Sequence, residues 1–524
     1  MSAAQRDGII GLDIGTTSAK AVAFTVDGVA RASGHAGYAL SNPHPGWAEQ
    51  DPEAVLAATL RATRQAVRGA QEAGLNVQGL ALSAAMHSLI ALDGSTTAIS
   101  PVLTWADARG ADQAARLRSG PRGLALHRRT GTPVHPMSPL VKLRWYREND
   151  PELAARARYW VGVKELVLQR LTGELVVDHG IASATGLFNL GDETWDSEAL
   201  AYAAVGPDQL ARLVPTTEVL RLNAEGARAV GLPEGTPVVA GSSDGPLANL
   251  GLGAIRRGTV ACSIGTSGAL RVVADAPSVD HRGRVFCYVL APGRYVIGGA
   301  VNNGGVVLDW LAETVARQLA DEARSTGRAP AEALLEAAGR AAAGSGGLLF
   351  LPQLLGERAP HWAGDPRGAW VGLTRAHRLE HLLRAAVEGV CMQLAIVLAA
   401  LGDAGVEVRE IRATGGFARS SLWRAILAGI FGRPIGFAAS PEGSALGAAL
   451  LGMTSLGMLE SLDRAADLVA VTHVERPDAD EAEAYARLLP HFEAAYAAVS
   501  RTSAALTDLQ DVLPVAPQPQ PGDI

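Results

Sequence analysis

Cysteine is scarce in this sequence. Only Cys262, Cys287 and Cys391 occur in 524 residues, and none of them belongs to a CxxC pair. The odd number argues against a disulfide framework. We therefore expect a protein of the reducing cytoplasm.

Long apolar runs and blocks of positive charge are also missing. The longest apolar run, 390–401, is interrupted by Gln393 and is typical of a core helix, and no stretch of about 18 apolar residues occurs. Residues 1–7 are polar, without the apolar core of a signal peptide. The net charge is −7 and no basic stripe stands out. We expect neither a membrane span nor a nucleic-acid partner.

The remaining composition is that of a soluble globular protein, with 48% hydrophobic and 19% charged residues. The length favours two large domains. Strand-like apolar segments alternate with helix-like periodic ones, which predicts the α/β class. After about Ser500 the apolar periodicity ends in a proline-rich stretch, which predicts a disordered tail.

One local pattern occurs twice. Residues 9–14 and 21–24 are predicted strands joined by Gly15-Thr16-Thr17-Ser18, and residues 259–264 and 269–273 surround Gly265-Thr266-Ser267-Gly268 in the same way. A repeat half a chain apart is too long for a solenoid. It predicts two domains of similar topology that face each other, with a boundary near 256–258.

Both turns suit phosphate binding. A Gly-Thr turn presents backbone N–H groups and hydroxyls in a small space. Asp13 precedes the first turn and is a candidate Mg²⁺ ligand, and Lys20 adds a charge. A plain hairpin turn explains either motif alone, but two such turns facing each other can hold one triphosphate.

Three further segments carry polar residues directly after predicted strands. Gly415-Gly416-Phe417, followed by Ser420, lies between a strand and a helix, where a backbone can approach a nucleotide. Asp244 ends a strand and is placed to accept a hydroxyl proton, although Asp-Gly more often marks a turn or a helix cap. Met86 and His87 could line a polyol pocket, although a lone histidine is more often structural.

Together these motifs resemble those of the FGGY carbohydrate kinases, within the actin-like ATPase superfamily. The similarity runs from about Gly8 to Leu489 through the motifs at 13–17, 243–245, 264–268, 356–360 and 415–420. The resemblance implies an α/β fold of two ribonuclease H-like (actin-like ATPase) domains around a central cleft. Residues 1–256 would form the sugar-binding and catalytic domain, residues 257–500 the nucleotide-binding domain, and residues 501–524 the tail.

The resemblance also implies roles for single residues. Asp244 would be the catalytic base and, with Asp13, a ligand of Mg²⁺. The sugar would contact Asp244 and Met86, His87, Trp105 and His135. ATP would be bound by Gly15, Thr16, Thr17, Ser18, Lys20, Gly265, Thr266, Ser267, Gly304, Gly415, Gly416, Phe417 and Ser420. The Arg-Glu pair that glycerol kinases carry in place of Met86-His87 is absent, which disfavours glycerol.

Several segments resemble the gluconokinase versions of these motifs, namely 83–88, 104–107, 129–133, 135–140 and 299–305. The implied reaction is transfer of the ATP γ-phosphoryl group to D-gluconate, giving 6-phospho-D-gluconate. A sugar acid needs a cation or several donors for its carboxylate, and Lys142, Arg144, Lys164 and His135 are candidates. Xylulose or another polyol as acceptor, a non-catalytic actin-like nucleotide or sugar sensor, and a homodimer remain open alternatives.

Overall fold

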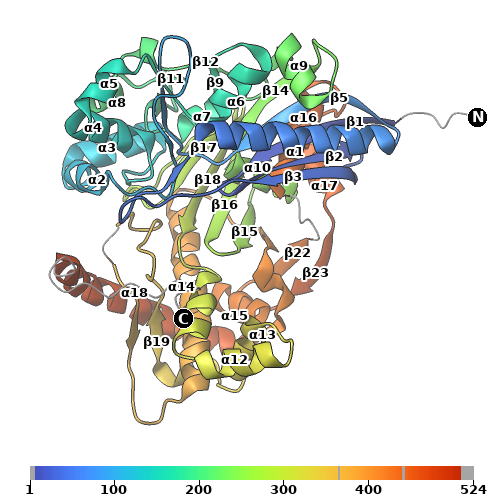
Figure 1. Ribbon diagram of the computed structural model, residues 1–524. Helices are drawn as coiled ribbons and strands as arrows, with labels where there is room; N and C mark the ends of the chain where they lie inside the picture. The colour runs from blue at the N-terminus through green and yellow to red at the C-terminus, as the bar shows by residue number, and fades with distance from the viewer. Residues whose placement is uncertain (1–5, 364–365, 439–442, 509–524) are drawn as a thin grey trace, which may run out of the picture.

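The computed structural model describes residues 6–363, 366–438 and 443–508. Two large sheets, one from each half of the chain, dominate the molecule (Figure 1). The fold is α/β with two ribonuclease H-like domains, as the sequence predicts.

The first sheet has the strand order β13-β14-β5-β1-β2-β3. β1 and β2 form the predicted antiparallel hairpin, β3 extends it, and β5 and β14 run parallel to β1. The strand bounds are β1 Arg6–Ile14, β2 Ser18–Thr25, β3 Ala30–Gly37, β5 Leu75–Ala84, β13 Val219–Arg221 and β14 Pro237–Ser243.

The second sheet has the order β17-β18-β16-β15-β21-β22-β23. β15 pairs antiparallel with β16 and parallel with β21, as β1 does with β2 and β5. β18 occupies the place that β3 has in the first sheet, so six strands of the second sheet have the same order of parallel and antiparallel pairings as the first sheet. β17 is an additional strand at the edge. The bounds are β15 Thr259–Ile264, β16 Gly268–Ala274, β17 Phe286–Ala291, β18 Arg294–Val301, β21 Glu410–Thr414, β22 Ile435–Ala438 and β23 Val471–Glu475.

Two helices cover opposite faces of the first sheet. α1 (Pro52–Glu72) packs on β2 and β3, where Gly34 faces the backbone of Ala62. α16 (Gly443–Ser455) comes from the far end of the chain and packs on β1 and β5, where Gly11 faces the Ala445 carbonyl. In turn, α10 (Asp244–Gly251) packs on α16 and reaches β16 and β17 of the second sheet. The two halves are therefore interlocked.

A helical lobe is inserted between β5 and β13, at the upper left of Figure 1. Its helices are α2 Ala111–Arg118, α3 Pro121–Thr130, α4 Pro139–Asn149, α5 Pro151–Arg156, α6 Val163–Thr172, α7 His179–Ser183 and α8 Ser197–Ala203, and α9 (Ala224–Val230) follows β13. Short strand pairs tie the lobe together, β4 Glu49–Gln50 with β7 Val102–Leu103, β6 Ile90–Leu92 with β8 Tyr159–Val161, β9 Val176–Asp178 with β12 Arg212–Val214, and β10 Phe188–Asn189 with β11 Thr194–Trp195.

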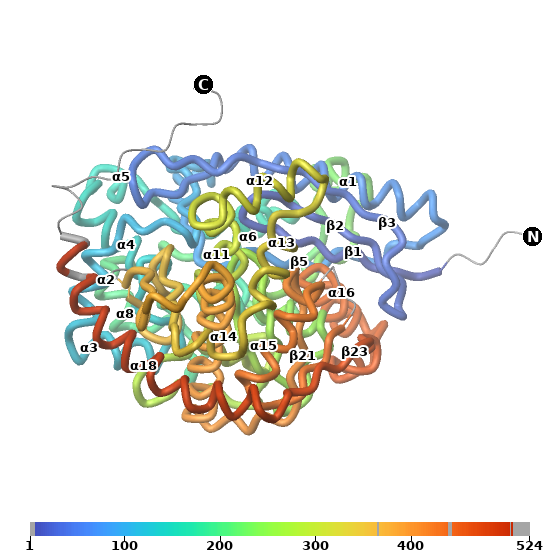
Figure 2. Tube along the Cα trace, turned by 90° about the horizontal axis from the view of Figure 1, so that it is seen from below, coloured from blue at the N-terminus to red at the C-terminus, as the bar shows by residue number. Residues whose placement is uncertain are grey.

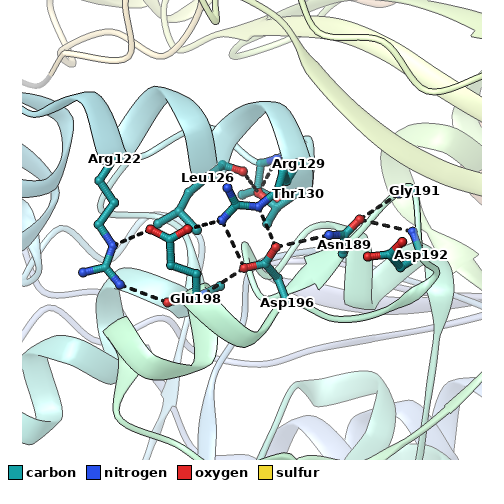
Figure 3. A network of polar contacts seen from close by, with 11 residues as sticks. Arg122, Leu126, Arg129, Thr130, Asn189, Gly191, Asp192, Asp196 and Glu198 are labelled. Atoms are coloured by element: carbon teal, nitrogen blue, oxygen red, sulfur yellow. Dashed lines mark hydrogen bonds and ion pairs between the residues drawn. The ribbon is translucent and has the colours of Figure 1, made fainter.

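A charged network fixes α3 to α8 within this lobe (Figure 3). Arg129 Nε lies 2.8 Å from Asp196 Oδ2, and its second nitrogen lies 2.6 Å from Glu198 Oε2. Asp196 also caps α8 through the Ala199 N–H. This network anchors the C-terminal end of α3, from which the chain continues through Gly131 to Met137 at the domain interface.

The second domain contains α14 (Leu379–Asp403), which packs on β16 and β18. It is the one helix of the described residues long and apolar enough to span a membrane, but 83% of its apolar window is buried within the protein. This matches the core helix predicted from the sequence. Around it lie α11 Val306–Glu313, α12 Arg317–Ser325, α13 Pro330–Ala338, α15 Ser421–Phe431, α17 Ala465–Leu468 and the pair β19 Leu349–Leu351 and β20 Ala369–Val371.

The predicted tail begins too early. α18 (Ala479–Asp508) continues past Ser500 and crosses α15 and α14 (Figure 2). Arg367 explains the extension, because its guanidinium donates to the Leu506 carbonyl at 2.9 Å and its N–H to the Ser503 hydroxyl at 3.4 Å. The rest of the predicted tail, 509–524, lies outside the described residues.

Candidate active site

A small cavity of about 260 Å³ lies between the two domains. From the first domain it is lined by Thr16, Met86, His87, Trp105, Met137, Asp244 and Gly245. From the second domain it is lined by Ser263, Ser267, Gly268, Ala269, Arg271, Phe286, Tyr288, Ala300, Arg358 and Trp362. Thr16 and Ser267 belong to the two Gly-Thr turns, so both turns border the same space.

A larger cavity of about 680 Å³ lies within the second domain. Its walls include Gly265 and Thr266 of the second turn, together with Gly416, Phe417 and Ser420. Five of the residues predicted to bind ATP are therefore gathered around one space. Ser420 also caps α15 by accepting the Trp423 N–H at 3.2 Å, so the helix begins at the cavity wall.

The second turn separates the two cavities. Gly265 and Thr266 face the larger space and Ser267 the smaller one. The turn is closed by a hydrogen bond from the Gly265 N–H to the Ser267 carbonyl at 2.8 Å. Gly304 donates to the Thr266 carbonyl at 3.0 Å and packs so closely that an added Cβ would lie 2.8 Å from the Gly265 oxygen. Gly304 lines neither cavity and instead supports the turn.

The first turn is held by its neighbours. The Gly15 N–H donates to the Ser18 carbonyl at 2.9 Å, and the Tyr38 N–H donates to the Thr17 carbonyl at 3.0 Å. Trp105 Nε1 donates to the Thr16 hydroxyl at 2.8 Å, which places the indole against the turn. Thr17, Ser18 and Lys20 line neither of the two cavities.

Asp13 and Asp244 lie at the same edge of the first sheet. Asp13 is in register with Ser83 on β5, and Ser83 is in register with Ser242 on β14, two residues before Asp244. The two parallel pairings place these strand ends about 10 Å apart, which is two strand spacings. The Ser83 hydroxyl donates to Asp13 Oδ1 at 2.7 Å. Lys20 faces Asp13 across the hairpin.

Asp244 is the first residue of α10 and follows β14 directly. Its Oδ1 accepts the Gly245 N–H at 2.7 Å. Burial raises the pKa of Asp244 above its usual 3.8, and the Arg271 charge partly opposes this. A carboxylate with a raised pKa is a better proton acceptor near neutral pH than an ordinary aspartate.

His87 presents a defined hydrogen-bonding face. Its Nδ1 lies 2.6 Å from the Ala184 carbonyl, and since a carbonyl only accepts, Nδ1 carries the proton. Burial lowers the pKa of His87 to about 3, and the Lys142 charge acts in the same direction. The ring is therefore neutral, with Nε2 left as an acceptor. Met86 lines the small cavity beside it.

His135 differs from the prediction. It does not line the small cavity, and its Nδ1 accepts the Met137 N–H at 3.2 Å. Its ring packs edge-on against Trp362, 6.3 Å between centroids. Burial lowers the pKa of His135 to about 3, so it supplies no positive charge. Its neighbour Met137 reaches the cavity instead.

Three of the cations considered for binding a substrate carboxylate, Lys142, Lys164 and Arg144, have other partners. Lys142 Nζ donates to the His87 carbonyl at 2.7 Å and to the Thr104 carbonyl at 2.6 Å. Lys164 Nζ lies 2.7 Å from Asp178 Oδ2 and donates to the Ser242 carbonyl. Arg144 pairs with Glu148 on the surface. These three residues hold the fold and line neither cavity.

Gly415 supports the wall of the larger cavity through its conformation. Its φ is 124°, and an added Cβ would lie 2.1 Å from the Ile264 oxygen. Only glycine fits such a backbone at this separation. Gly415 thus lets β21 end against the second turn, although Gly416 and Phe417 form the cavity wall.

Sequence reasoning missed two cavity arginines. Arg358 belongs to the motif at 356–360, which carries no single-residue assignment, and the sequence around Arg271 predicts only a strand. A signal for Arg271 existed, because it is the one charged residue of the apolar strand Gly268–Ala274 and shares a face with Ala269. Tyr288 and Trp362 were missed because nothing in their local sequence marks a cavity.

Comparison with known proteins agrees with this geometry. Residues 8–251 match the N-terminal domain and residues 260–456 the C-terminal domain of the FGGY family of carbohydrate kinases. The chain belongs to the FGGY family of carbohydrate kinases. As an FGGY kinase, it is an ATP-dependent sugar kinase that acts on small molecules.

Relatives of this FGGY kinase include a gluconokinase of Bacillus subtilis, 42% identical over 486 residues that cover 92% of this chain and 94% of the relative. Among solved structures, a gluconate kinase from Lactobacillus acidophilus is 33% identical with a TM-score of 0.89, covering 96% of this chain and 100% of its own. A xylulose kinase from the same species is 32% identical with a TM-score of 0.86, covering 97% and 99%.

Proposed function

We propose that this chain transfers the γ-phosphoryl group of ATP to the 6-hydroxyl of D-gluconate. One observation carries the proposal, namely that a single phosphate-type turn forms the wall between a nucleotide-sized cavity and a small polar cavity containing Asp244. The 42% identity to a gluconokinase supports gluconate as the acceptor.

In this proposal ATP occupies the larger cavity, with its phosphates at Gly265 and Thr266. The backbone N–H groups of the turns and the hydroxyls of Thr16 and Ser267 suit phosphate oxygens. Phe417 and Ser420 lie on the adenosine side. The sugar occupies the small cavity, where the unprotonated Nε2 of His87 accepts a hydrogen bond from one of the sugar hydroxyl groups.

Asp244 is the proposed base. It accepts the proton of the 6-hydroxyl as the O6–Pγ bond forms and the bond from Pγ to the β-phosphate oxygen breaks, releasing ADP. Its raised pKa suits this role. Enclosure between two domains excludes water that would otherwise accept the phosphoryl group.

The residues present also fit Mg²⁺. The described residues contain no group of three His, Cys, Asp or Glu side chains that could form a complete metal cage. Mg²⁺ bound to a nucleotide does not need one, because it takes one or two carboxylates together with phosphate oxygens and water. Asp13 and Asp244 would be these carboxylates, and Mg²⁺ would neutralise charge on the phosphates. Three buried free thiols among the described residues suit the cytoplasmic location that we propose.

A substrate panel tests the proposal. ADP release is measured with D-gluconate, other aldonates, D-xylulose and glycerol under identical conditions. We expect the highest kcat/KM on D-gluconate. Fast turnover of D-xylulose with none on D-gluconate would overturn the gluconate assignment in favour of a xylulose kinase.

A further inference from the structure

The small cavity has an excess of positive charge. Its charged lining residues are Asp244, Arg271 and Arg358, while His87 is neutral because of its low pKa. The three charges sum to +1. A neutral sugar would leave this excess uncompensated, whereas one substrate carboxylate would cancel it.

Neither arginine has a carboxylate partner among the described residues. Arg271 donates weakly to the Ser263 hydroxyl at 3.4 Å, and Arg358 donates to the Val301 carbonyl at 3.2 Å. The Nε of Arg358 is buried without any hydrogen-bond partner in the described part of the chain. Several other buried or partly buried cations are paired with acids, namely Arg109, Lys164, Arg284 and Arg384, while Lys142 donates to two backbone carbonyls. The Asp244 charge acts on both guanidinium groups, but one carboxylate can balance only one of them. Because an uncompensated charge in an enclosed site is costly, the second guanidinium calls for an acidic ligand.

Both guanidinium groups are held in place by the fold. Arg271 extends over the start of α10, where an added Cβ on Gly245 would lie 3.4 Å from its Nε. Arg358 lies over the Trp105 ring, 4.9 Å from the centroid. The loop of Arg358 is fixed on both sides, because Asn303 donates to the Gly356 carbonyl at 2.9 Å and the Ala359 N–H donates to the Ala300 carbonyl at 2.9 Å.

Both arginines share the small cavity with the proposed base. Arg271 lies on β16, three residues beyond Gly268 and therefore about 10 Å along the strand from the phosphate turn. Its guanidinium lies over the start of α10, and the charges of both arginines act on Asp244. A substrate carboxylate held by the two guanidinium groups would therefore lie in the same small cavity as the acceptor hydroxyl.

We propose that Arg271 and Arg358 together bind the carboxylate of the sugar acid and set the preference for acids over neutral polyols. This assignment rests on the proposed function. Two planar guanidinium groups offer several N–H donors to the two carboxylate oxygens. Both arginines come from the second domain, whereas Asp244 and His87 come from the first, so an acid substrate links the two domains.

The test compares D-gluconate with D-glucitol, which has the same six-carbon chain with a hydroxymethyl group in place of the carboxylate. Arg271→Met and Arg358→Met are the variants. The control is Arg294→Met, whose arginine pairs with Asp275 and Asp463 away from the cavity. Steady-state kinetics are combined with calorimetric binding of each sugar in the absence of ATP.

We expect each cavity variant to lose about 100-fold in kcat/KM for gluconate, mainly through KM, as when one partner of a buried charge pair is truncated. D-glucitol kinetics should change far less, so the gluconate-to-glucitol ratio falls. Arg271→Lys and Arg358→Lys should restore part of the ratio, and Arg294→Met should leave it unchanged.

An unchanged ratio in both methionine variants, with ATP binding and circular dichroism intact, would overturn the carboxylate assignment while leaving the proposed function in place. A wild-type enzyme that binds and phosphorylates neutral sugars better than any aldonate would overturn both. If another aldonate is the preferred substrate, the same variants must lower its binding relative to the matching polyol, and the assignment fails if they do not.

Discussion

The two cavities differ in how they are built. The walls of the larger cavity come from the second domain alone, and its lining includes no residue before Ile264. The small cavity takes its walls from both domains and holds the three charged residues on which we base acceptor chemistry and specificity. In the proposed assignment, nucleotide binding is therefore local to one domain, whereas phosphoryl transfer requires that the two domains meet.

Asp244→Asn should have the largest effect, and it tests whether the two cavities have separate roles. The variant keeps the shape of the small cavity but cannot take a proton. We expect kcat to fall at least a hundredfold, within the roughly 10²–10⁴-fold range of general-base effects. ATP affinity, measured by calorimetry in the absence of Mg²⁺, should stay unchanged because Asp244 does not line the larger cavity. An unaltered transfer rate would refute the proposed mechanism.

Gly415→Ala should affect the other cavity. The alanine methyl group would meet the Ile264 oxygen at a φ of 124°. We expect a loss of about 1–3 kcal/mol in the free energy of unfolding, together with a rise in KM for ATP and little change in KM for the sugar. Denaturant titration and steady-state kinetics measure these effects.

Gly402→Ala is the matched control for Gly415→Ala. An added Cβ on Gly402 meets nothing within 4 Å, and its site in α14 favours alanine. If both variants behave alike, the close contact between β21 and the second turn does not matter for ATP binding.

The smallest expected effect is a shift in pH dependence. Asp244 must be deprotonated to act, so kcat/KM for the sugar falls as pH decreases through its pKa, which burial raises above 3.8. The Arg271 charge opposes that rise. Arg271→Met should therefore move the acid limb to higher pH. Because the pKa of His87 is about 3, its titration does not change kcat/KM near neutral pH. Profiles from about pH 4.5 to 8 check this, and an acid limb that moves to lower pH would contradict it.

Much of the fold could be predicted because its signals are local. The two hairpins, the helix α14 and the strand before Gly415 follow from apolar periodicity and glycine punctuation. The recurrence of the Gly-Thr turn predicted paired domains because a repeated turn implies repeated topology. The roles of the site residues remain predictions.

Other features depend on long-range packing and could not be predicted. No local pattern tells that α16, which lies between β22 and β23 of the second sheet in sequence, covers the first sheet. The same holds for the continuation of α18 through its contacts with Arg367. Likewise, Lys142, Lys164 and Arg271 all look alike as cations in mostly apolar segments. Only the tertiary structure shows that the lysines bond to carbonyls or to Asp178, whereas Arg271 lines the cavity.

The cover that α16 provides has a consequence for biosynthesis. The Gly11 face of β1 lacks its α16 cover until residues 443–455 have been made, because Ala445 and Ala449 of α16 lie nearest to it. After α10 is complete at Gly251, about 200 further residues must follow, which takes roughly 10–40 s at 5–20 residues per second. During that interval the nascent chain leaves the α16 side of β1 and β5 uncovered.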